Sequence, residues 1–231
     1  MSRLADGARR ALDVVVAGTL LLVTSPLLAA VALLVRATSY GPVLFVQNRV
    51  GKDGRLFELL KFRTMVADAP ARGGVLTAPH DARITRAGAV LRRWKLDELP
   101  QLWNVLRGDM SLVGPRPEVP RYVAGYSERQ RLVLCVRPGI TDPASLAFVD
   151  EAAVLAHFDD VERGYVEHVL PAKLACSLTY LERRTLRSDL GVLVRTLGRI
   201  AHGGSASPDS NHTAADTGRR PGRAALGQEG P

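Results

Sequence analysis

The sequence predicts an α+β fold dominated by helices, with an N-terminal re-entrant membrane helix hairpin, a short β-hairpin, and amphipathic helices at the membrane interface. Three observations lead to this prediction. An uncharged apolar run occupies residues 14–35, about the length that a helix needs to cross a bilayer. The hydrophobic pattern then changes to a period of two over residues 43–62, as expected for strands. It returns to helical spacing in most of the segments that follow.

The apolar run has a break at its centre, where Thr24, Ser25 and Pro26 stand. Pro26 removes one helical hydrogen bond, and the two hydroxyls can bond to carbonyls that a bend leaves free. Arginines flank the run on both sides, so the positive charge favours neither orientation across a membrane. We therefore expect a re-entrant hairpin with both ends on the cytoplasmic side. A kinked spanning helix is the alternative, whereas a cleaved signal peptide would have a shorter core and a small-residue cleavage site.

Two short strands are predicted after this segment, at residues 43–49 and 55–62, around a glycine-containing turn at residues 51–54. The second strand leads into a basic pair, Lys61 and Arg63, on either side of an aromatic residue. Such a pair binds phosphate in some proteins and extends toward a membrane surface in others. The pattern leaves both interpretations open.

A basic amphipathic helix is predicted over residues 83–94. Ile84 and Leu91 share its apolar face, and Arg92 is one of four arginines around that face. Such a helix suits the headgroup layer of an anionic membrane, although an ordinary solvated face shows the same pattern. The chain runs directly from this helix into Asp97, so the membrane interpretation places that carboxylate near the lipid surface.

Residues 96–117 carry the main chemical signal. Two adjacent carboxylates, Asp97 and Glu98, open a run with helical spacing, and Arg116 closes it between two prolines. A helix that begins at the acid pair would place Pro100 in its first turn and direct free N–H groups toward bound anions. This ordering suggests a reactive acid pair on a rigid support. The structural alternative is that the acids cap the helix, as acidic residues before an apolar helical run usually do.

The composition favours a body that attracts anions. The 231 residues are 46% hydrophobic and 23% charged, with a formal net charge of +8, which is compatible with nucleic acid, anionic lipid or phosphorylated small molecules. Cys135 and Cys176 form neither a disulfide framework nor a paired zinc spacing. Further helices are predicted over residues 171–181 and 186–200, and the polar residues 201–231 suggest a disordered tail.

Four stretches together resemble the bacterial sugar transferase family, the small monotopic phosphoglycosyl transferases. The stretches are GPVLFVQNRVGKDGRLFELLKFRTM, the RITRAG and LRR segment, LDELPQLWNVLRGDMSLVGPRP, and RPGIT. They follow the family order through nearly all of residues 1–200, and the central block is long and specific. The resemblance implies a membrane anchor at residues 1–40, a catalytic domain at residues 41–200, and the tail at residues 201–231. It also favours the catalytic interpretation of the acid pair over the structural one.

The resemblance implies a two-step transfer at the cytoplasmic face of the bacterial inner membrane. The carboxylate of Asp97 would attack the phosphorus attached to the sugar of a UDP-sugar and expel UMP. Polyprenyl (undecaprenyl) phosphate would then take the phosphosugar and begin a lipid-linked glycan. Mg²⁺ is the implied cofactor, with Glu98 and the neighbouring Asp97 as ligands and diphosphate oxygens completing the shell.

The resemblance also suggests roles for basic residues. Lys61 and Arg116 would contact phosphate or hold the active-site geometry, Arg92 would contact the phosphate of the lipid, and Arg63 is counted with these substrate-binding residues. Ser25 and Pro26 match the motif that bends the anchor. After residue 141 the chain departs from many family members, which continue into a tryptophan and a glutamine–asparagine motif. That departure puts the sugar specificity in doubt more than the chemistry.

Two other classes of function remain as alternatives. A non-catalytic membrane-anchored scaffold or regulator of a glycan assembly complex would use the acid pair as a helix cap. A nucleic-acid binder would explain the positive charge, but the uncharged membrane segment and the scarcity of aromatic residues disfavour it, so no nucleic-acid partner is expected. The sequence leaves open which UDP-sugar is used, which glycan is built, and whether the chain works as a monomer or a homodimer.

Overall fold

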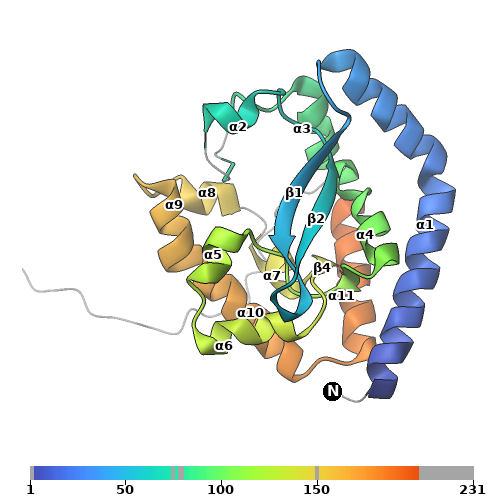
Figure 1. Cartoon of the computed structure of the whole chain (residues 1–231), viewed down its shortest axis with the longest axis vertical. Coiled ribbons are helices and arrows are strands. Elements are labelled where there is room, and N and C mark those ends of the chain that lie inside the picture. The colour runs from blue at the N-terminus through green and yellow to red at the C-terminus, as the bar shows by residue number, and fades with distance from the viewer. Residues whose placement is uncertain (1–2, 74–75, 78–80, 149–150, 203–231) are drawn as a thin grey trace, which may run out of the picture.

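The chain folds mainly into helices, with four strands in the described residues (Figure 1). The computed structural model describes residues 3–73, 76–77, 81–148 and 151–202. Within these ranges the strands are β1 (Leu44–Val50), β2 (Leu56–Phe62), β3 (Ser111–Val113) and β4 (Gly139–Thr141). The α-helices are α1 (Arg3–Thr38), α2 (Ala69–Arg72), α3 (Arg86–Arg93), α4 (Gln101–Arg107), α5 (Pro120–Ala124), α6 (Glu128–Arg131), α7 (Pro143–Ala147), α8 (Glu151–Leu155), α9 (Val161–Gly164), α10 (Leu170–Glu182) and α11 (Leu186–Ala201). Shorter helical turns are η1 (Lys52–Gly54), η2 (Leu96–Glu98), η3 (Leu132–Cys135) and η4 (Tyr165–Val169). The predicted helix-dominated α+β class is confirmed.

The first helix, α1, has 36 residues and continues through Pro26. Its ribbon curves, and its last turn lies above the start of β1 (Figure 1). Pro26 has no N–H to bond the carbonyl of Leu22, four residues earlier. Ser25 Oγ donates to that oxygen instead, at 2.8 Å, and Thr24 Oγ1 donates to another carbonyl one turn back, at 2.7 Å. The predicted role is confirmed for Ser25, whereas Thr24 bonds to the carbonyl of Leu20, which Pro26 does not leave free. The re-entrant path of α1 through a membrane stays a prediction.

The long helix combines an apolar exposed side with contacts to the body of the protein. Its stretch Asp6–Thr38 is long and apolar enough to cross a membrane, judged by length and composition. Ala17, near the middle, is fully buried against α4. Val31 and Val35, near the end, pack with Leu91 of α3. The body therefore contacts both halves of α1.

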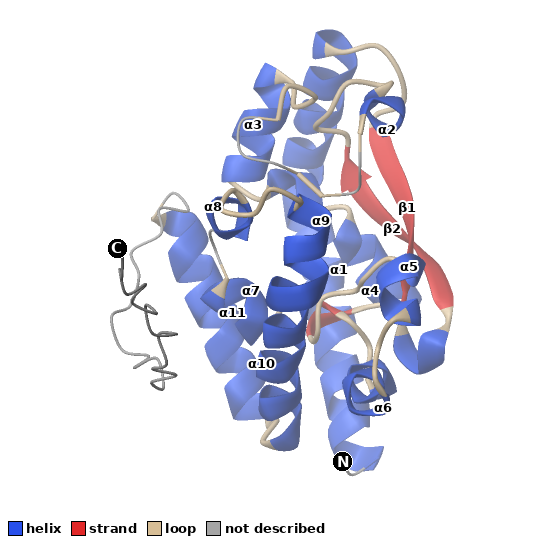
Figure 2. Ribbon diagram, turned by 90° about the vertical axis from the view of Figure 1, so that its left-hand side faces the viewer, coloured by secondary structure: helices blue, strands red, loops and turns tan. Residues whose placement is uncertain are grey.

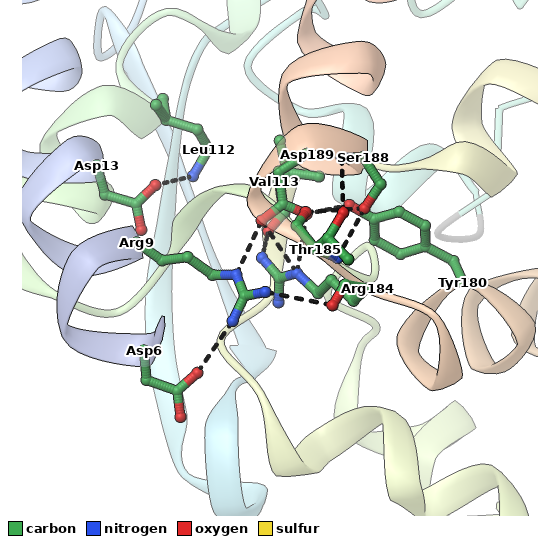
Figure 3. A network of polar contacts seen from close by, with 10 residues as sticks. All are labelled: Asp6, Arg9, Asp13, Leu112, Val113, Tyr180, Arg184, Thr185, Ser188 and Asp189. Carbon is green, nitrogen blue, oxygen red and sulfur yellow. Dashed lines mark hydrogen bonds and ion pairs between the residues drawn. The ribbon is translucent and has the colours of Figure 1, made fainter. Parts of the chain in front are cut away.

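A buried network of charges fastens the start of α1 to the last helices (Figure 3). Arg9 Nε donates to Asp189 Oδ2 at 3.0 Å, and Arg184 Nε donates to Asp189 Oδ1 at 3.0 Å. The hydroxyl of Tyr180 also donates to Asp189 Oδ1. One turn further along α1, Asp13 Oδ1 accepts a backbone N–H of β3 at 3.0 Å. These bonds join α1, β3, α10 and α11 into one unit.

The predicted β-hairpin is confirmed. β1 and β2 are antiparallel, with Leu44 opposite Phe62 at the open end. In the turn, Asp53 and Gly54 have positive φ angles of 57° and 75°, a conformation that glycine adopts freely and aspartate tolerates. A two-stranded hairpin needs packing on one face to be stable. Side chains of β2 obtain this packing in the core cluster that also contains residues of α4. The hairpin itself lies on the side of the molecule opposite α11 (Figure 2).

The acid pair lies on a turn of its own, which corrects the prediction of one helix beginning at Asp97 or Glu98. Lys95 has a left-handed φ of 56°, which separates α3 from η2. The turn η2 then ends because Pro100 has no N–H to continue the hydrogen-bond ladder, and α4 begins at Gln101. The prediction of free N–H groups at this helix start is also wrong for Glu98, because its backbone N–H donates to the carbonyl of Lys95 at 3.2 Å.

The C-terminal half supports the segment that carries Arg116. β3 and β4 pair in parallel, with Ser111 beside Gly139. The helices predicted over residues 171–181 and 186–200 are confirmed as α10 and α11, which lie to the left of the hairpin in Figure 2. The predicted tail begins at the last residue of α11, and residues 203–231 lie outside the described ranges.

Candidate active site

Four elements bring charged side chains together around η2. The turn itself carries Asp97 and Glu98, β2 supplies Lys61, α3 supplies Arg92, and the loop after β3 supplies Arg116. The electrostatic neighbours of Asp97 include Glu98, Lys61 and Arg92. The structure thus gathers five of the residues that the sequence singled out, although they span residues 61 to 116.

Glu98 is held by two cations. Its Oε1 accepts Lys61 Nζ at 3.1 Å and Arg116 Nη2 at 2.9 Å, and its side chain is only 11% exposed. Burial alone would raise the pKa of Glu98, but the charges of Arg116 and Lys61 outweigh burial and hold that pKa well below its ordinary value. The pKa of Arg116 is raised in turn by Glu98. Glu98 and Arg116 are therefore charged near neutral pH. Burial lowers the pKa of Lys61, and Glu98 is the strongest of the charges that oppose this shift.

Asp97 has the opposite environment. It is 7% exposed, and its Oδ1 is buried without a hydrogen-bond partner among the described residues. Burial raises the pKa of its carboxyl, and the neighbouring negative charge of Glu98 raises it further. A carboxylate that is neither solvated nor paired keeps its lone pairs available. The site therefore holds one acid in an ion pair and leaves the other free to react.

Arg92 reaches toward the same region from α3. Its Nε donates to Thr64 Oγ1 at 2.8 Å, and its Nη1 donates to Thr77 Oγ1 at 3.3 Å. Burial lowers the pKa of Arg92, and Asp97 is the strongest of the charges that oppose this shift. Close packing fixes the position of α3, because a Cβ on Gly88 would lie 2.0 Å from the carbonyl oxygen of Thr64. The described partners of Arg92 are neutral hydroxyls, so its charge is available to an anion.

Three of the predicted residues lie elsewhere. Arg63 Nη2 donates to both the carbonyl and the hydroxyl of Ser39, each at 2.8 Å, just past the end of α1. Its Nε and Nη1 are buried without a partner in the described part of the chain. Ser25 and Pro26 are exposed at the middle of α1. The structure does not bring these three into the cluster at η2.

The comparisons with known proteins decide the family. The model of the bacterial sugar transferase family matches residues 4–203. This chain belongs to that family. The described turn with Asp97 and Glu98, the hairpin, and the loop with Arg116 all fall inside the matched range.

Curated relatives of this sugar transferase carry related names. The chain is 36% identical over 198 residues to the UDP-N-acetylgalactosamine-undecaprenyl-phosphate N-acetylgalactosaminephosphotransferase of Aeromonas hydrophila, which covers 84% of the chain and 44% of that protein. It is 37% identical over 205 residues to the UDP-glucose:undecaprenyl-phosphate glucose-1-phosphate transferase of Caulobacter vibrioides, covering 83% and 69%. It is 45% identical over 145 residues to the exopolysaccharide production protein PSS of Rhizobium leguminosarum, covering 60% and 72%. The chain thus spans less than half of the Aeromonas protein.

The sequence analysis missed the residues that position the charged cluster of this sugar transferase. Asn104 is fully buried, and its side chain bonds to the backbone of β2 on both sides of Leu59, accepting from Leu60 N at 3.1 Å and donating to Glu58 O at 2.7 Å. Asp142 Oδ2 accepts the backbone N–H of Arg116 at 2.8 Å. Neither residue has a local signal, since an isolated Asn or Asp in a helical or turn segment has many roles. Their partners are distant in sequence.

The acid pair fits a magnesium ion that is shared with a substrate. No cluster of three or more His, Cys, Asp or Glu side chains that could hold a metal is found in the described residues. Asp97 and Glu98 provide adjacent oxygen ligands of the kind Mg²⁺ prefers, and Asp97 Oδ1 has an unused buried lone pair. Mg²⁺ often keeps few protein ligands and takes the rest from phosphate and water. The residues present therefore fit the ion if a diphosphate completes its shell.

Proposed function

We propose that this sugar transferase moves a sugar-1-phosphate from a UDP-sugar to polyprenyl (undecaprenyl) phosphate, releasing UMP and starting a lipid-linked glycan. The observation that carries the proposal is the buried carboxylate of Asp97, unpaired within the described residues while Glu98 holds two cations. A carboxylate in this state is suited to act as a nucleophile. The names of the Aeromonas and Caulobacter relatives, which pair a UDP-sugar with undecaprenyl phosphate, support the same substrates.

In the first step, an oxygen of Asp97 forms a bond to the phosphorus attached to the sugar. The bond between that phosphorus and the oxygen bridging the two phosphates breaks, and UMP leaves with the bridging oxygen and the bonding electrons. Two anions approach each other in this step, so positive charge close by lowers the barrier. Lys61 and Arg116 supply that charge while Glu98 fixes their positions. The enzyme is left with a phosphosugar bound covalently to Asp97.

In the second step, an oxygen of polyprenyl phosphate attacks the same phosphorus. The bond to Asp97 breaks, the carboxylate is restored, and the product is a polyprenyl diphosphate sugar. Arg92 is suited to hold the phosphate of the incoming lipid, because its described partners are hydroxyls and it lies on the basic helix α3. Both steps use the same nucleophile position, so the two substrates bind in turn.

Glu98 and Asp97 are the residues that would hold Mg²⁺ against the diphosphate. Bound there, the ion would neutralise charge on the transferred and leaving phosphates. The negative charge of Glu98, kept by its lowered pKa, suits it to this role at neutral pH.

The location of the reaction follows from the substrates. A UDP-sugar stays in the cytoplasm and a polyprenyl phosphate stays in the bilayer, so the site belongs at the cytoplasmic surface of the membrane. A re-entrant α1 suits this location. The start of α1 is tied to Asp189 through Arg9, and its end packs on α3 through Val35. Contacts of both ends of α1 with the same body support a re-entrant path over a spanning one.

A product assay tests the reaction. Purified protein in detergent micelles is incubated with Mg²⁺, polyprenyl phosphate and a panel of UDP-sugars, and the nucleotide released is identified. We expect UMP from at least one UDP-sugar and none from the Asp97→Asn variant. Release of UDP would show an ordinary glycosyl transfer and overturn the proposal.

A trapping experiment separates the two-step mechanism from direct transfer. With radiolabelled UDP-sugar and no lipid acceptor, wild-type protein should retain label on the peptide that contains Asp97, and Asp97→Asn should not. Turnover by wild-type protein without any covalent label would point to direct transfer. Full activity of Asp97→Asn would instead favour the non-catalytic role of the acid pair, with activity arising from elsewhere.

A further inference from the structure

Gln101, at the start of α4, has a buried amide nitrogen that bonds to no group in the described residues. The residue is 2% exposed, and its Nε2 has no hydrogen-bond partner among the described residues. Buried polar groups in folded proteins are nearly always paired, so an unpaired one calls for an explanation such as an absent ligand. The described residues hold four buried side-chain atoms in this state: two on Arg63, one on Asp97 and one on Gln101.

The two unpaired groups at Asp97 and Gln101 lie one helical turn apart. The residues just before α4, Leu99 and Pro100, both have helical backbone angles, with φ of −55° and −60°. The hydrogen bonds across this junction join residues three apart, from Leu99 N to Leu96 O and from Leu102 N to Leu99 O, and residues at this spacing lie on the same side of the chain. Gln101 therefore projects from the side that carries Glu98, the neighbour of Asp97 in the acid pair.

The residues on either side of Gln101 in the chain show that this side faces β2. Three residues earlier, Glu98 bonds to the side chain of Lys61 on β2. Three residues later, Asn104 bonds to the backbone of β2. Gln101 is buried and three residues from each of these anchors, so it lies on the side of the chain that faces β2. A ligand that contacts both Asp97 and Glu98 occupies the side of the chain from which Gln101 projects.

A phosphoryl group would satisfy both unpaired atoms at once. Asp97 Oδ1 offers a lone pair and Gln101 Nε2 offers an N–H, yet the two atoms do not bond to each other. Phosphorus accepts the carboxylate oxygen, and a non-bridging oxygen accepts the N–H. The amide is neutral, so it contributes a hydrogen bond without forming an ion pair with Asp97. Lys61 and Arg116 are already engaged by Glu98.

We propose that Gln101 is a catalytic residue, whose side-chain amide donates a hydrogen bond to a non-bridging oxygen of the phosphoryl group that Asp97 attacks. The inference rests on the function proposed above. Charge builds on these oxygens as the bond to UMP breaks, so a fixed N–H there stabilises the transition state more than the bound substrate. The phosphoryl group is common to all UDP-sugars. The contribution of Gln101 is therefore the same for every sugar that the enzyme accepts.

The test compares full-length Gln101→Met with wild-type protein in the first step alone, without lipid acceptor. Methionine has a similar size and no N–H. We expect the rate of UMP release to fall about 100-fold, the effect of losing one such hydrogen bond in other enzymes, with little change in KM for the UDP-sugar. The unfolding temperature should stay equal or rise, because the substitution removes an unpaired buried group. Gln101→Glu, which replaces the N–H with negative charge, should be slower still.

Gln130→Met provides the matched control, because the same substitution is then made at a partly exposed capping-box position on α6, and it should keep wild-type rates. An unchanged rate in Gln101→Met, while wild-type protein releases UMP, would overturn the role of Gln101 and leave the proposed function standing. A loss that differs between UDP-sugars would overturn it in favour of a contact to the sugar. A lowered unfolding temperature that accounts for the lost activity would show a structural role. If wild-type protein releases UDP, both proposals fail.

Discussion

Asp97 and Glu98 are neighbours in the chain, but their surroundings move the pKa values of their carboxyls in opposite directions. Glu98 has two cations within hydrogen-bond distance, and its pKa is lowered. Asp97 has burial and a like charge, and its pKa is raised. Pairs of acids whose environments separate their pKa values divide the chemical work between them. Here the division is between a group that holds cations and a group that attacks phosphorus.

The first prediction concerns stability in the absence of metal and substrate. Asp97→Asn removes a buried charge that has no partner, so we expect the free energy of unfolding at pH 7.5, a chosen assay pH, to rise by about 1 kcal/mol. Glu98→Gln leaves Lys61 and Arg116 without their anion, so we expect it to fall by about 3 kcal/mol. Thermal unfolding in micelles with a chelator measures both. Destabilisation by both substitutions to the same degree would contradict the opposite environments.

The pH dependence of this difference has a definite sign. Because the pKa of Asp97 is raised in the folded protein above its ordinary value of 3.8, folded protein binds the proton more tightly than unfolded protein does. Wild-type protein therefore loses stability as pH rises through this window, and Asp97→Asn does not. The advantage of Asp97→Asn should shrink as pH falls from neutral toward the pKa of Asp97. An advantage that grows on acidification would contradict the raised pKa.

At the scale of residues, the sequence revealed which side chains meet but not how they pair. Two adjacent acids and a proline-flanked arginine are visible as a motif, and the family resemblance added Lys61 and Arg92 to the predicted site. The pairing of Glu98 with Lys61 and Arg116 connects positions 37 and 18 residues apart, and no local pattern encodes that distance. Gln101 was missed because a glutamine at the start of a helix has no distinctive spacing. Only its burial without a partner draws attention to it.

At the scale of elements, the site depends on the junction between β2 and α4. Asn104 bonds to two backbone groups at the free edge of β2, replacing the strand that would otherwise lie there. Lys61 follows directly on that edge and Glu98 precedes α4, so the same junction sets the distance between them. The hairpin and the helices α1, α3, α10 and α11 were predictable from periodicity. The separation of η2 from α4 was not, because Pro100 is equally compatible with the first turn of one continuous helix.

The next prediction tests the path of α1 in the membrane. Single cysteines are placed at Gly7, where a Cβ meets no neighbour within 4 Å, and at Tyr40, which is 88% exposed, after Cys135 and Cys176 are replaced by serine. If α1 is re-entrant, a membrane-impermeant maleimide should label both positions in inverted inner-membrane vesicles and neither in intact spheroplasts. Labelling of the two positions from opposite sides would establish the spanning alternative. Retained UMP release shows that each variant is folded.

At the scale of the whole molecule, the catalytic body is closed by contacts between the two ends of the described chain. Arg9 and Asp189 are 180 residues apart, and both are nearly buried. Asp189 also receives Arg184 and Tyr180, while Arg184 Nη2 donates to the carbonyl of Val113 in β3 at 2.7 Å. The residues that surround Arg9 and Asp189 in the sequence give no indication that the two form an ion pair. The network (Figure 3) holds α1 in place on the body that carries η2.

The asymmetry of this network gives the last prediction. Asp189→Asn leaves two buried guanidinium groups, those of Arg9 and Arg184, without their shared anion, so we expect unfolding free energy to fall by about 4 kcal/mol. Arg9→Met leaves Asp189 with Arg184 and Tyr180 as partners, so the loss should be no more than about half as large. Thermal unfolding measures the difference, and limited proteolysis should cut the start of α1 sooner in both variants. Equal losses would mean that Arg9 and Asp189 act as an isolated pair and that the other partners contribute little. The ratio of the two losses therefore reports whether α1 is held by one bond or by a network that also fixes α11.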